Sequence, residues 1–165
     1  MNTEIVSEEI REANLEEALT IADRCFDKSW SQERIRVDYR KYIDDQRSFY
    51  ELALEEEVNL LKYYLHRVEG NVIGLSGLYS YTSAEDSCWL GWFAIDPEKQ
   101  KLGYGTKVLQ FIIERAKALG MQKLFLHTEQ DNASARRFYE NNGFILCTEV
   151  CAWDRELVKY EMPLK

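Results

Sequence analysis

The feature of this sequence that most constrains its fold is an apolar run that leads through a glycine-bearing loop into an amphipathic stretch. Residues Cys88–Ile95 are apolar nearly throughout, which is typical of a strand covered on both faces. The dipeptide Asp96-Pro97 ends this predicted strand. The apolar spacing then predicts a helix from Gly103 or Tyr104 to Leu119, with Gly120 as its left-handed terminator. A strand, a loop and a helix in this order favour a fold in which helices cover a sheet.

Two helices are predicted before this segment. Apolar residues recur at intervals of three and four in Asn14–Phe26, and Asn14 is placed to cap the helix that this pattern predicts. A second helix is predicted from Ser29 or Ser31 to about Ile43, because Ser29 and Gln32 have the spacing of a capping box.

Between these helices and Cys88 the pattern changes to that of strands. Lys62–Val68 and Val72–Thr82 are strand-like, and the turn residues Glu69-Gly70-Asn71 separate them. The sequence therefore predicts an antiparallel hairpin. Residues Ser48–Leu61 are ambiguous, with a third short helix as one option.

After Gly120 the chain alternates strand, helix and strands. Lys123–Thr128 is a predicted strand, and Asn132–Asn141 is a predicted helix with its cap at Asp131 or Asn132 and its end at Asn142-Gly143. Two further strands are predicted over Phe144–Ala152 and Leu157–Met162.

The complete order is a strand, helices, three strands, a helix, a strand, a helix and two strands. This order predicts an α/β or α+β fold with a mixed central sheet of about seven strands flanked by helices. A chain of 165 residues has room for one substantial core, and it contains no internal repeat or low-complexity tract. We therefore expect residues 1–165 to form a single domain.

Composition excludes several classes of function. The net charge of −8 argues against a nucleic-acid partner, since phosphate contacts need a basic face. The four cysteines contain no CxxC pair and only two histidines could join them, so no metal site is expected. No apolar run approaches the roughly 20 residues that span a bilayer, and residues 1–10 do not resemble a signal peptide. We expect a soluble, cytoplasmic protein with no membrane partner.

The charge is unevenly distributed along the chain. Residues 1–100 contain 21 acidic and 11 basic side chains, whereas residues 101–165 contain 8 acidic and 10 basic ones. The two parts are therefore expected to face differently charged ligands.

The loop Gln100–Thr106 is the segment best suited to bind a ligand. It leaves a buried strand and enters a helix through Gly103 and Gly105, so its backbone N–H groups and the helix dipole favour an anion such as a diphosphate. A purely structural turn is the alternative. The P-loop pattern is excluded by the order Gly105-Thr106-Lys107, and the dinucleotide fingerprint by Val108.

Two motifs together resemble the GNAT superfamily of N-acetyltransferases. Phe93–Gly105 is similar to the end of the family's fourth strand and its pyrophosphate loop, Gln/Arg-x-x-Gly-x-Gly/Ala. Asn132–Phe144 is similar to a second signature, in which Asn132, Ala135, Tyr139, Gly143 and Phe144 are in register. The resemblance covers the C-terminal two-thirds of the chain closely and the first 60 residues only in element order.

The resemblance implies a GNAT-like fold with splayed fourth and fifth strands and with acetyl-CoA as the acyl donor. The main chain of the fourth strand would pair with the pantetheine arm, the following loop would bind the pyrophosphate through backbone N–H groups, and Asn132 would face the pantetheine or its phosphates. The residues implied to bind the cofactor are Phe93, Ala94, Ile95, Lys101, Leu102, Gly103, Tyr104, Gly105, Thr106, Asn132 and Tyr139.

The resemblance also implies a catalytic role for Tyr139, as the general acid that protonates the departing thiolate. The alternative for Tyr139 is a packing residue. Some family members place a glutamate as general base on the fourth strand, but the comparable residue here is Trp89. Glu85 and Asp86 lie just upstream, where a solvated turn also accounts for them, so the base is unassigned.

The function implied by the resemblance is transfer of an acetyl group to an amine, which can be a small molecule or belong to a peptide or protein. The acidic first part of the chain suits a cationic amine, and a homodimer is allowed. Two alternatives stay open, namely a non-catalytic acyl-CoA sensor of the same fold and an interaction domain without a cofactor.

Overall fold

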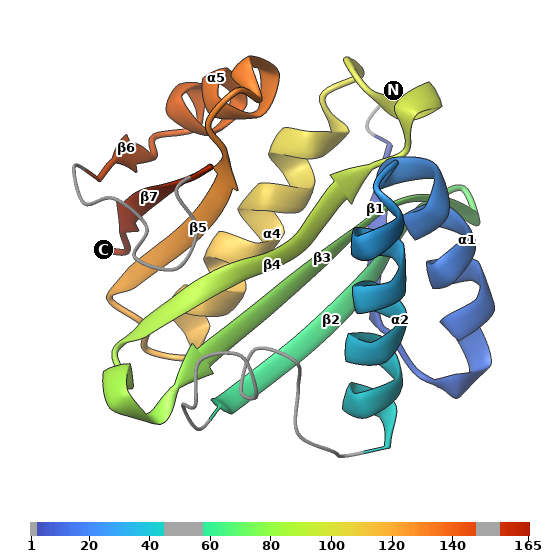
Figure 1. Ribbon diagram of the computed structural model, residues 1–165, viewed down its shortest axis with the longest axis horizontal. Coiled ribbons are helices and arrows are strands. Elements are labelled where there is room, and N and C mark those ends of the chain that lie inside the picture. Colours follow the sequence, from blue (N-terminus) through green and yellow to red (C-terminus); the bar gives the residue numbers. More distant parts are fainter. Residues whose placement is uncertain (1–2, 45–57, 148–155) are drawn as a thin grey trace.

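The chain folds around one seven-stranded sheet in a computed structural model that describes residues 3–44, 58–147 and 156–165. The strands lie in the order β1-β2-β3-β4-β5-β7-β6 (Figure 1). All neighbouring pairs are antiparallel except β4 and β5, which are parallel. The strands are β1 (Ile5–Glu9), β2 (Val58–Val68), β3 (Asn71–Tyr81), β4 (Ser87–Ile95), β5 (Lys123–Glu129), β6 (Ile145–Leu146) and β7 (Leu157–Pro163). The predicted mixed sheet of about seven strands is confirmed.

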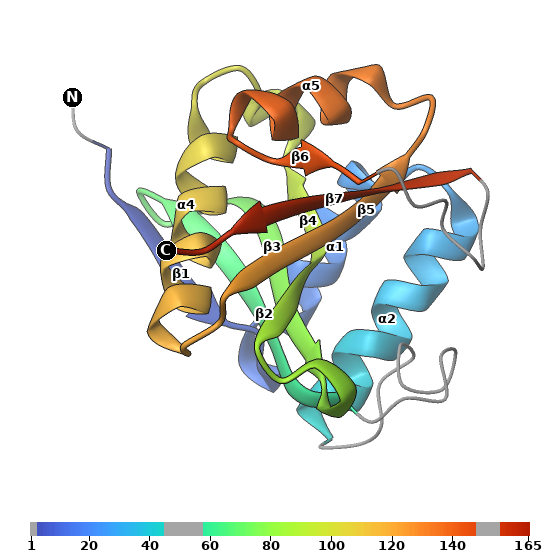
Figure 2. The same cartoon turned by 90° about the vertical axis from the view of Figure 1, so that its left-hand side faces the viewer.

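Helices cover both faces of the sheet, as the apolar stripes predict. The helices α1 (Leu15–Cys25) and α2 (Ser29–Ile43) lie on one face and α4 (Tyr104–Ala118) on the other, while α5 (Ala133–Asn141) lies beside β6 and β7 (Figures 1 and 2). All four coincide within a residue or two with the helices predicted from the sequence. Gly120 has the predicted left-handed conformation with a φ of 79°.

Each face of the sheet has its own apolar core. Under α4, Leu109 and Ile112 pack with Leu90, Leu124 and Leu126 of the strands. Under α1 and α2, the core consists of Ile10, Leu15, Ala18, Ile21, Ala22, Ile35, Tyr39, Tyr63, Leu65 and Leu75. Because neighbouring residues of a strand point to opposite faces, one strand supplies side chains to both cores.

The predicted hairpin is confirmed. β2 and β3 pair up to Val68 and Asn71, so the loop has only two residues, Glu69 and Gly70. Their φ values are 50° and 79°, which is the left-handed pair that a tight hairpin turn of matching twist requires.

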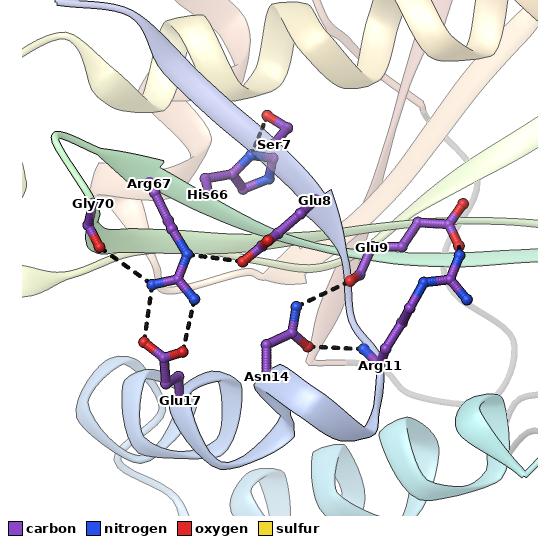
Figure 3. Close-up of polar contacts among 9 residues, drawn as sticks. All are labelled: Ser7, Glu8, Glu9, Arg11, Asn14, Glu17, His66, Arg67 and Gly70. Carbon is purple, nitrogen blue, oxygen red and sulfur yellow. Dashed lines mark hydrogen bonds and ion pairs between the residues drawn. The ribbon is translucent and has the colours of Figure 1, made fainter.

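Two predicted helix caps are not formed. The Oδ1 atom of Asn14 accepts from the backbone of Arg11 and its Nδ2 atom donates to Glu9 O, so Asn14 fixes the turn before α1 instead of capping the helix (Figure 3). The predicted capping box of Ser29 is wrong as well. The Nε2 atom of Gln32 donates to Phe26 O at 2.7 Å and fixes the connection between α1 and α2.

Two segments predicted from the sequence lie partly outside the described residues. Of Ser48–Leu61, the part from Val58 onward belongs to β2, and residues 45–57 lie outside the described residues. The predicted strand Phe144–Ala152 is found only as Ile145–Leu146, and residues 148–155 also lie outside the described part.

Polar side chains connect β1 and α1 to the strand β2 (Figure 3). The guanidinium of Arg67 on β2 contacts the carboxylates of Glu8 and Glu17. These contacts raise the pKa of Arg67 still further, so this group holds its charge at any relevant pH. The imidazole of His66 lies between Ser7 Oγ at 2.8 Å and Ser76 Oγ at 2.7 Å. These side chains thus hold α1 against the sheet beside the β2–β3 hairpin.

Candidate active site

The parallel strands β4 and β5 separate after a short ladder. Only Ser87, Cys88 and Trp89 pair with β5, opposite Lys123, Leu124 and Phe125. Beyond Trp89 the two strands diverge in Figure 1, and β4 continues along β3 while β5 continues along β7. The predicted splay of the fourth and fifth strands is therefore confirmed.

A cavity of about 1550 Å³ lies at this divergence. Its lining includes side chains from both faces of the sheet, for example Leu126 from the core under α4 and His127 from the opposite face. The cavity therefore runs through the sheet at the gap between the two strands.

β4 contains a bulge at the edge of this gap. Leu75 pairs with Ala94 and Gly77 pairs with Gly91, so β4 has one residue more than β3 between these pairs. Trp92 lies within the bulge with a φ of 42°, an unusual value for a bulky residue. Its Nε1 atom donates to the fully buried carboxylate of Asp38 on α2 at 2.8 Å. The helix α2 thus fixes the bulge that turns the backbone of Phe93 toward the cavity.

The loop after β4 leaves the first backbone N–H groups of α4 without a side-chain cap. Gln100 Nε2 donates to Ile95 O at 3.1 Å, and Lys101 and Gly103 have φ values of 62° and 82°. No side chain caps α4, and its first turn has no acidic residue, in contrast to α1 with Glu16 and Glu17. The first N–H groups of a helix lack partners within the helix and carry partial positive charge. This end of α4 therefore suits an anion.

Glycine at position 105 is favoured by close packing. A Cβ atom at this position would lie 3.3 Å from Phe138 Cε2, so a side chain would push against the ring on α5. At Gly103, nothing lies within 4 Å of such an atom, and the positive φ is what selects glycine there. Glycine is thus favoured at the two positions for different reasons, close packing at Gly105 and a positive φ at Gly103.

Tyr139 is one of the residues that line the cavity. Its side chain is 8% exposed and packs against Phe93, Phe138 and Phe144. Burial raises the pKa of its phenol, so the hydroxyl stays protonated at neutral pH. Among the described residues none hydrogen-bonds to this hydroxyl, which leaves it available to a ligand. The packing alternative and the catalytic prediction are both compatible with this position.

Most of the predicted cofactor residues lie together. Asn132 lines the cavity, and its Oδ1 atom also accepts from Ala135 N at 3.1 Å, which is the predicted cap of α5. The other predicted residues that line the cavity are Phe93, Ala94, Ile95, Lys101, Gly103, Gly105, Thr106 and Tyr139. Leu102 and Tyr104 are not among the lining residues, and Leu102 is 62% exposed. Their side chains point elsewhere because the loop turns at Lys101 and Gly103, and only their main chain can contribute.

Residues that the sequence motifs did not single out form the other half of the lining. They come from α2 and from β3, β5 and β7, and they include Trp30, Arg34, Tyr79, His127 and Lys159. Glu85 and Asp86 are not among the lining residues, so the structure gives no support to either as a general base. From the alternation of side chains along β5, the sequence alone could have placed His127 on the same face as Phe125. Only the order of the strands in the sheet shows that this face borders the gap.

A family model described as the acetyltransferase (GNAT) family matches residues 15–144. The chain belongs to the GNAT acetyltransferase family. This assignment agrees with the two motifs, which lie on the two sides of the gap between β4 and β5. The match spans α1 through α5, so the family's core elements are those described above.

Individual relatives agree with this family. Over 59 residues this GNAT chain is 36% identical to the [ribosomal protein bS18]-alanine N-acetyltransferase of Haemophilus ducreyi, covering 36% of this chain and 41% of the relative. Over 82 residues it is 28% identical to the "Probable N-acetyltransferase camello" of Xenopus tropicalis, covering 50% of this chain and 37% of the relative. The matches thus span less than half of these curated relatives.

Solved structures share the fold over nearly the whole GNAT chain. The PaiA N-acetyltransferase of Thermoplasma acidophilum, solved in complex with coenzyme A, superimposes with a TM-score of 0.73 at 16% identity. The alignment covers 97% of this chain and 99% of that one. At this identity the likeness concerns the fold.

Neither a cluster of metal ligands nor a membrane-spanning helix is present in the described part of the chain. Within residues 3–44, 58–147 and 156–165 no group of three potential metal ligands is found. In the same residues, no helix has the length and apolar character needed to cross a bilayer.

Proposed function

We propose that this GNAT domain transfers an acetyl group from acetyl-CoA to an amine. The observation that carries this proposal is a single cavity that joins an uncapped helix N-terminus, the free edge of β4 and the hydroxyl of Tyr139. The helix N-terminus can bind an anion, the free edge of β4 offers main-chain hydrogen-bonding groups, and the hydroxyl can donate a proton. Together they match a long phosphorylated carrier that ends in a thioester.

The residues present fit coenzyme A along the gap. The first N–H groups of α4, beside Gly103 and Gly105, would bind the diphosphate, and Lys101 would add positive charge. The main chain of Phe93, Ala94 and Ile95 would pair with the pantetheine amides as an added strand. Asn132 would border the same arm. When bound, this group supplies an activated acetyl thioester.

Tyr139 would act on the sulfur. As the amine nitrogen bonds to the thioester carbon, the carbon–sulfur bond breaks and the thiolate is left with a negative charge. A phenol that is protonated and buried can donate a hydrogen bond to that charge or protonate it. Because burial raises the pKa of Tyr139, hydrogen bonding to the thiolate gains weight relative to full proton transfer.

The proposed acceptor is an amine of a small molecule, peptide or protein. The name of the Haemophilus ducreyi relative points to an N-terminal alanine, and the acidic first part of the chain suits any cationic amine. A cytoplasmic location and a single domain over residues 1–165 are parts of this proposal.

Two measurements test the proposed function. Coenzyme A at 100 times its Kd should raise the free energy of unfolding by about 2.7 kcal/mol, and acetyl-CoA with an amine should release free thiol. The amines are spermidine, Nα-acetyllysine amide and a tetrapeptide that begins with alanine. Stabilisation without thiol release for any amine would favour the acyl-CoA sensor, and no stabilisation would favour an interaction domain.

A further inference from the structure

The cavity presents different chemistry on the two faces of the sheet. Leu126 packs in the core under α4 together with Tyr139. His127, the next residue of β5, points to the opposite face because side chains alternate along a strand. Both Tyr139 and His127 line the cavity. A group placed in the gap between β4 and β5 would therefore have the phenol on one side and the imidazole on the other.

The ring of His127 is held against Trp89. The two ring centroids lie 4.7 Å apart with an angle of 29° between the planes, and Trp89 also contacts Phe125 at 5.0 Å. Trp89 and Phe125 form the last pair of the β4–β5 ladder. The half-buried imidazole is thus placed where the strands begin to diverge, on the face opposite to Tyr139.

We propose that His127 accepts the proton that the ammonium form of the acceptor amine loses before the free amine attacks the thioester. This role rests on the proposed function and completes it, since no residue had been assigned as general base. An amine that enters as an ammonium ion loses two protons before it is an amide. One would pass to His127 and then to solvent. The second leaves the nitrogen as the carbon–sulfur bond breaks and ends on the thiolate beside Tyr139, so charge and atoms balance.

His127 is better suited to this task than the groups around it. An imidazole changes protonation near pH 6.5, close to the pH at which it would work. Lysine and arginine are charged at neutral pH and cannot accept, and carboxylates near ~4 are weak bases. Glu129 is in addition paired with Lys28. The charged and titratable residues that line this side of the cavity are Asp27, Lys28, Arg34, Tyr79, Tyr81, Glu129, Glu156 and Lys159.

Lys159 is a cation on the neighbouring strand β7. It is the β7 partner of His127 in register, and its Nζ atom lies 4.4 Å from the Phe125 ring centroid and 5.5 Å from that of Trp89. Lys159 and Trp89 thus border His127 from the two strands beside β5.

The test replaces His127 with glutamine, which keeps a polar side chain but does not titrate. The matched control is Lys123→Gln, on the same strand and face but outside the cavity lining. With Nα-acetyllysine amide at pH 7, kcat/KM for thiol release should fall about 10²- to 10⁴-fold in His127→Gln. Coenzyme A affinity should be unchanged, and Lys123→Gln should match the parent chain in both.

The pH profile separates a proton acceptor from a structural residue. The loss in His127→Gln should shrink as the pH approaches ~10.4, where a lysine amine deprotonates by itself. It should also be smaller for the alanine tetrapeptide, whose amine titrates near ~8. A loss of the same size at every pH and for both amines, or no loss, overturns the role of His127.

A second measurement needs no variant. The chain contains two histidines, and His66 is fully buried. Diethyl pyrocarbonate should therefore modify His127 first and abolish thiol release in proportion to that single modification. Full activity after modification of His127 contradicts the role. If the unmodified chain releases no thiol with any amine, the proposed function fails first and the role of His127 fails with it.

Discussion

At the scale of single residues, the two histidines of the chain lie in different environments. His66 is 0% exposed between two serine hydroxyls and burial lowers its pKa to about 3, whereas His127 is half-buried in the wall of the cavity. The sequence alone shows two histidines in strand-like segments and does not distinguish them. The distinction comes from Ser7 and Ser76, which strand pairing brings to either side of the His66 ring.

The low pKa of His66 predicts the pH dependence of stability. Above pH ~6.5 the imidazole is neutral in both the folded and the unfolded chain. Below that pH the unfolded chain binds the proton first, so the free energy of unfolding falls by up to about 1.4 kcal/mol per pH unit until about pH 3. Urea unfolding of His66→Gln at pH 7, 5 and 4 should show a shallower fall than the parent chain. Equal slopes for His66→Gln and the parent chain would contradict this.

Tyr139 gives the second prediction at this scale. Replacing it with phenylalanine keeps the ring contacts to Phe93, Phe138 and Phe144 but removes the hydroxyl. Turnover should fall about 10²-fold or more, because the thiolate loses its donor. Coenzyme A affinity, measured by calorimetry, should change little. Unaltered turnover would show that Tyr139 serves packing only.

At the scale of elements, the sequence predicted the helices and most strands because their apolar periodicity is strong. The bulge in β4 could not be predicted, since it depends on register against β3 and on Asp38 from α2. The caps of Asn14 and Ser29 were predicted wrongly because neighbouring backbone groups bind the side chains of Asn14 and of Gln32, the partner of Ser29 in the predicted capping box. The turn of the loop Gln100–Thr106 was predicted because its glycines mark backbone geometry directly.

Gly103 and Gly120 form a matched pair for testing the loop. Both have a φ near 80° and open space where a Cβ atom would stand. Alanine at either position should lower the free energy of unfolding by about 1 to 2 kcal/mol, the cost of a left-handed residue with a side chain. Only Gly103→Ala should also weaken coenzyme A binding, by about tenfold, because its methyl group stands at the anion site. Equal affinities in the two variants would remove the loop from the site.

The contact between α2 and the bulge is testable by a double-mutant cycle. Asp38→Ala and Trp92→Phe each remove one partner of the hydrogen bond at 2.8 Å. Since the acceptor is a buried carboxylate, the coupling free energy in urea unfolding should be about 1.5 to 3 kcal/mol. Thiol release should fall in each single variant because the bulge positions the backbone of Phe93. A coupling near zero would mean that the bulge is fixed without Asp38.

At the scale of the whole molecule, two sheet segments are joined by the three residue pairs between β4 and β5. The antiparallel segment β1–β4 and the segment β5–β7 are held together by this ladder, by the cores on both faces and by the Lys28–Glu129 ion pair. The sequence predicted this architecture through its resemblance to a family. The shape of the acceptor half of the cavity was not predictable, because its residues come from four separate elements.

At this scale the proposed binding site for an acyl carrier is the gap between β4 and β5. The most direct test is a crystal structure of the chain with coenzyme A. The diphosphate should lie on the N–H groups at the start of α4, and the pantetheine should run beside Ala94 with its sulfur near Tyr139. Coenzyme A bound at any other surface, or a gap that stays filled by side chains at saturating ligand, would contradict the account.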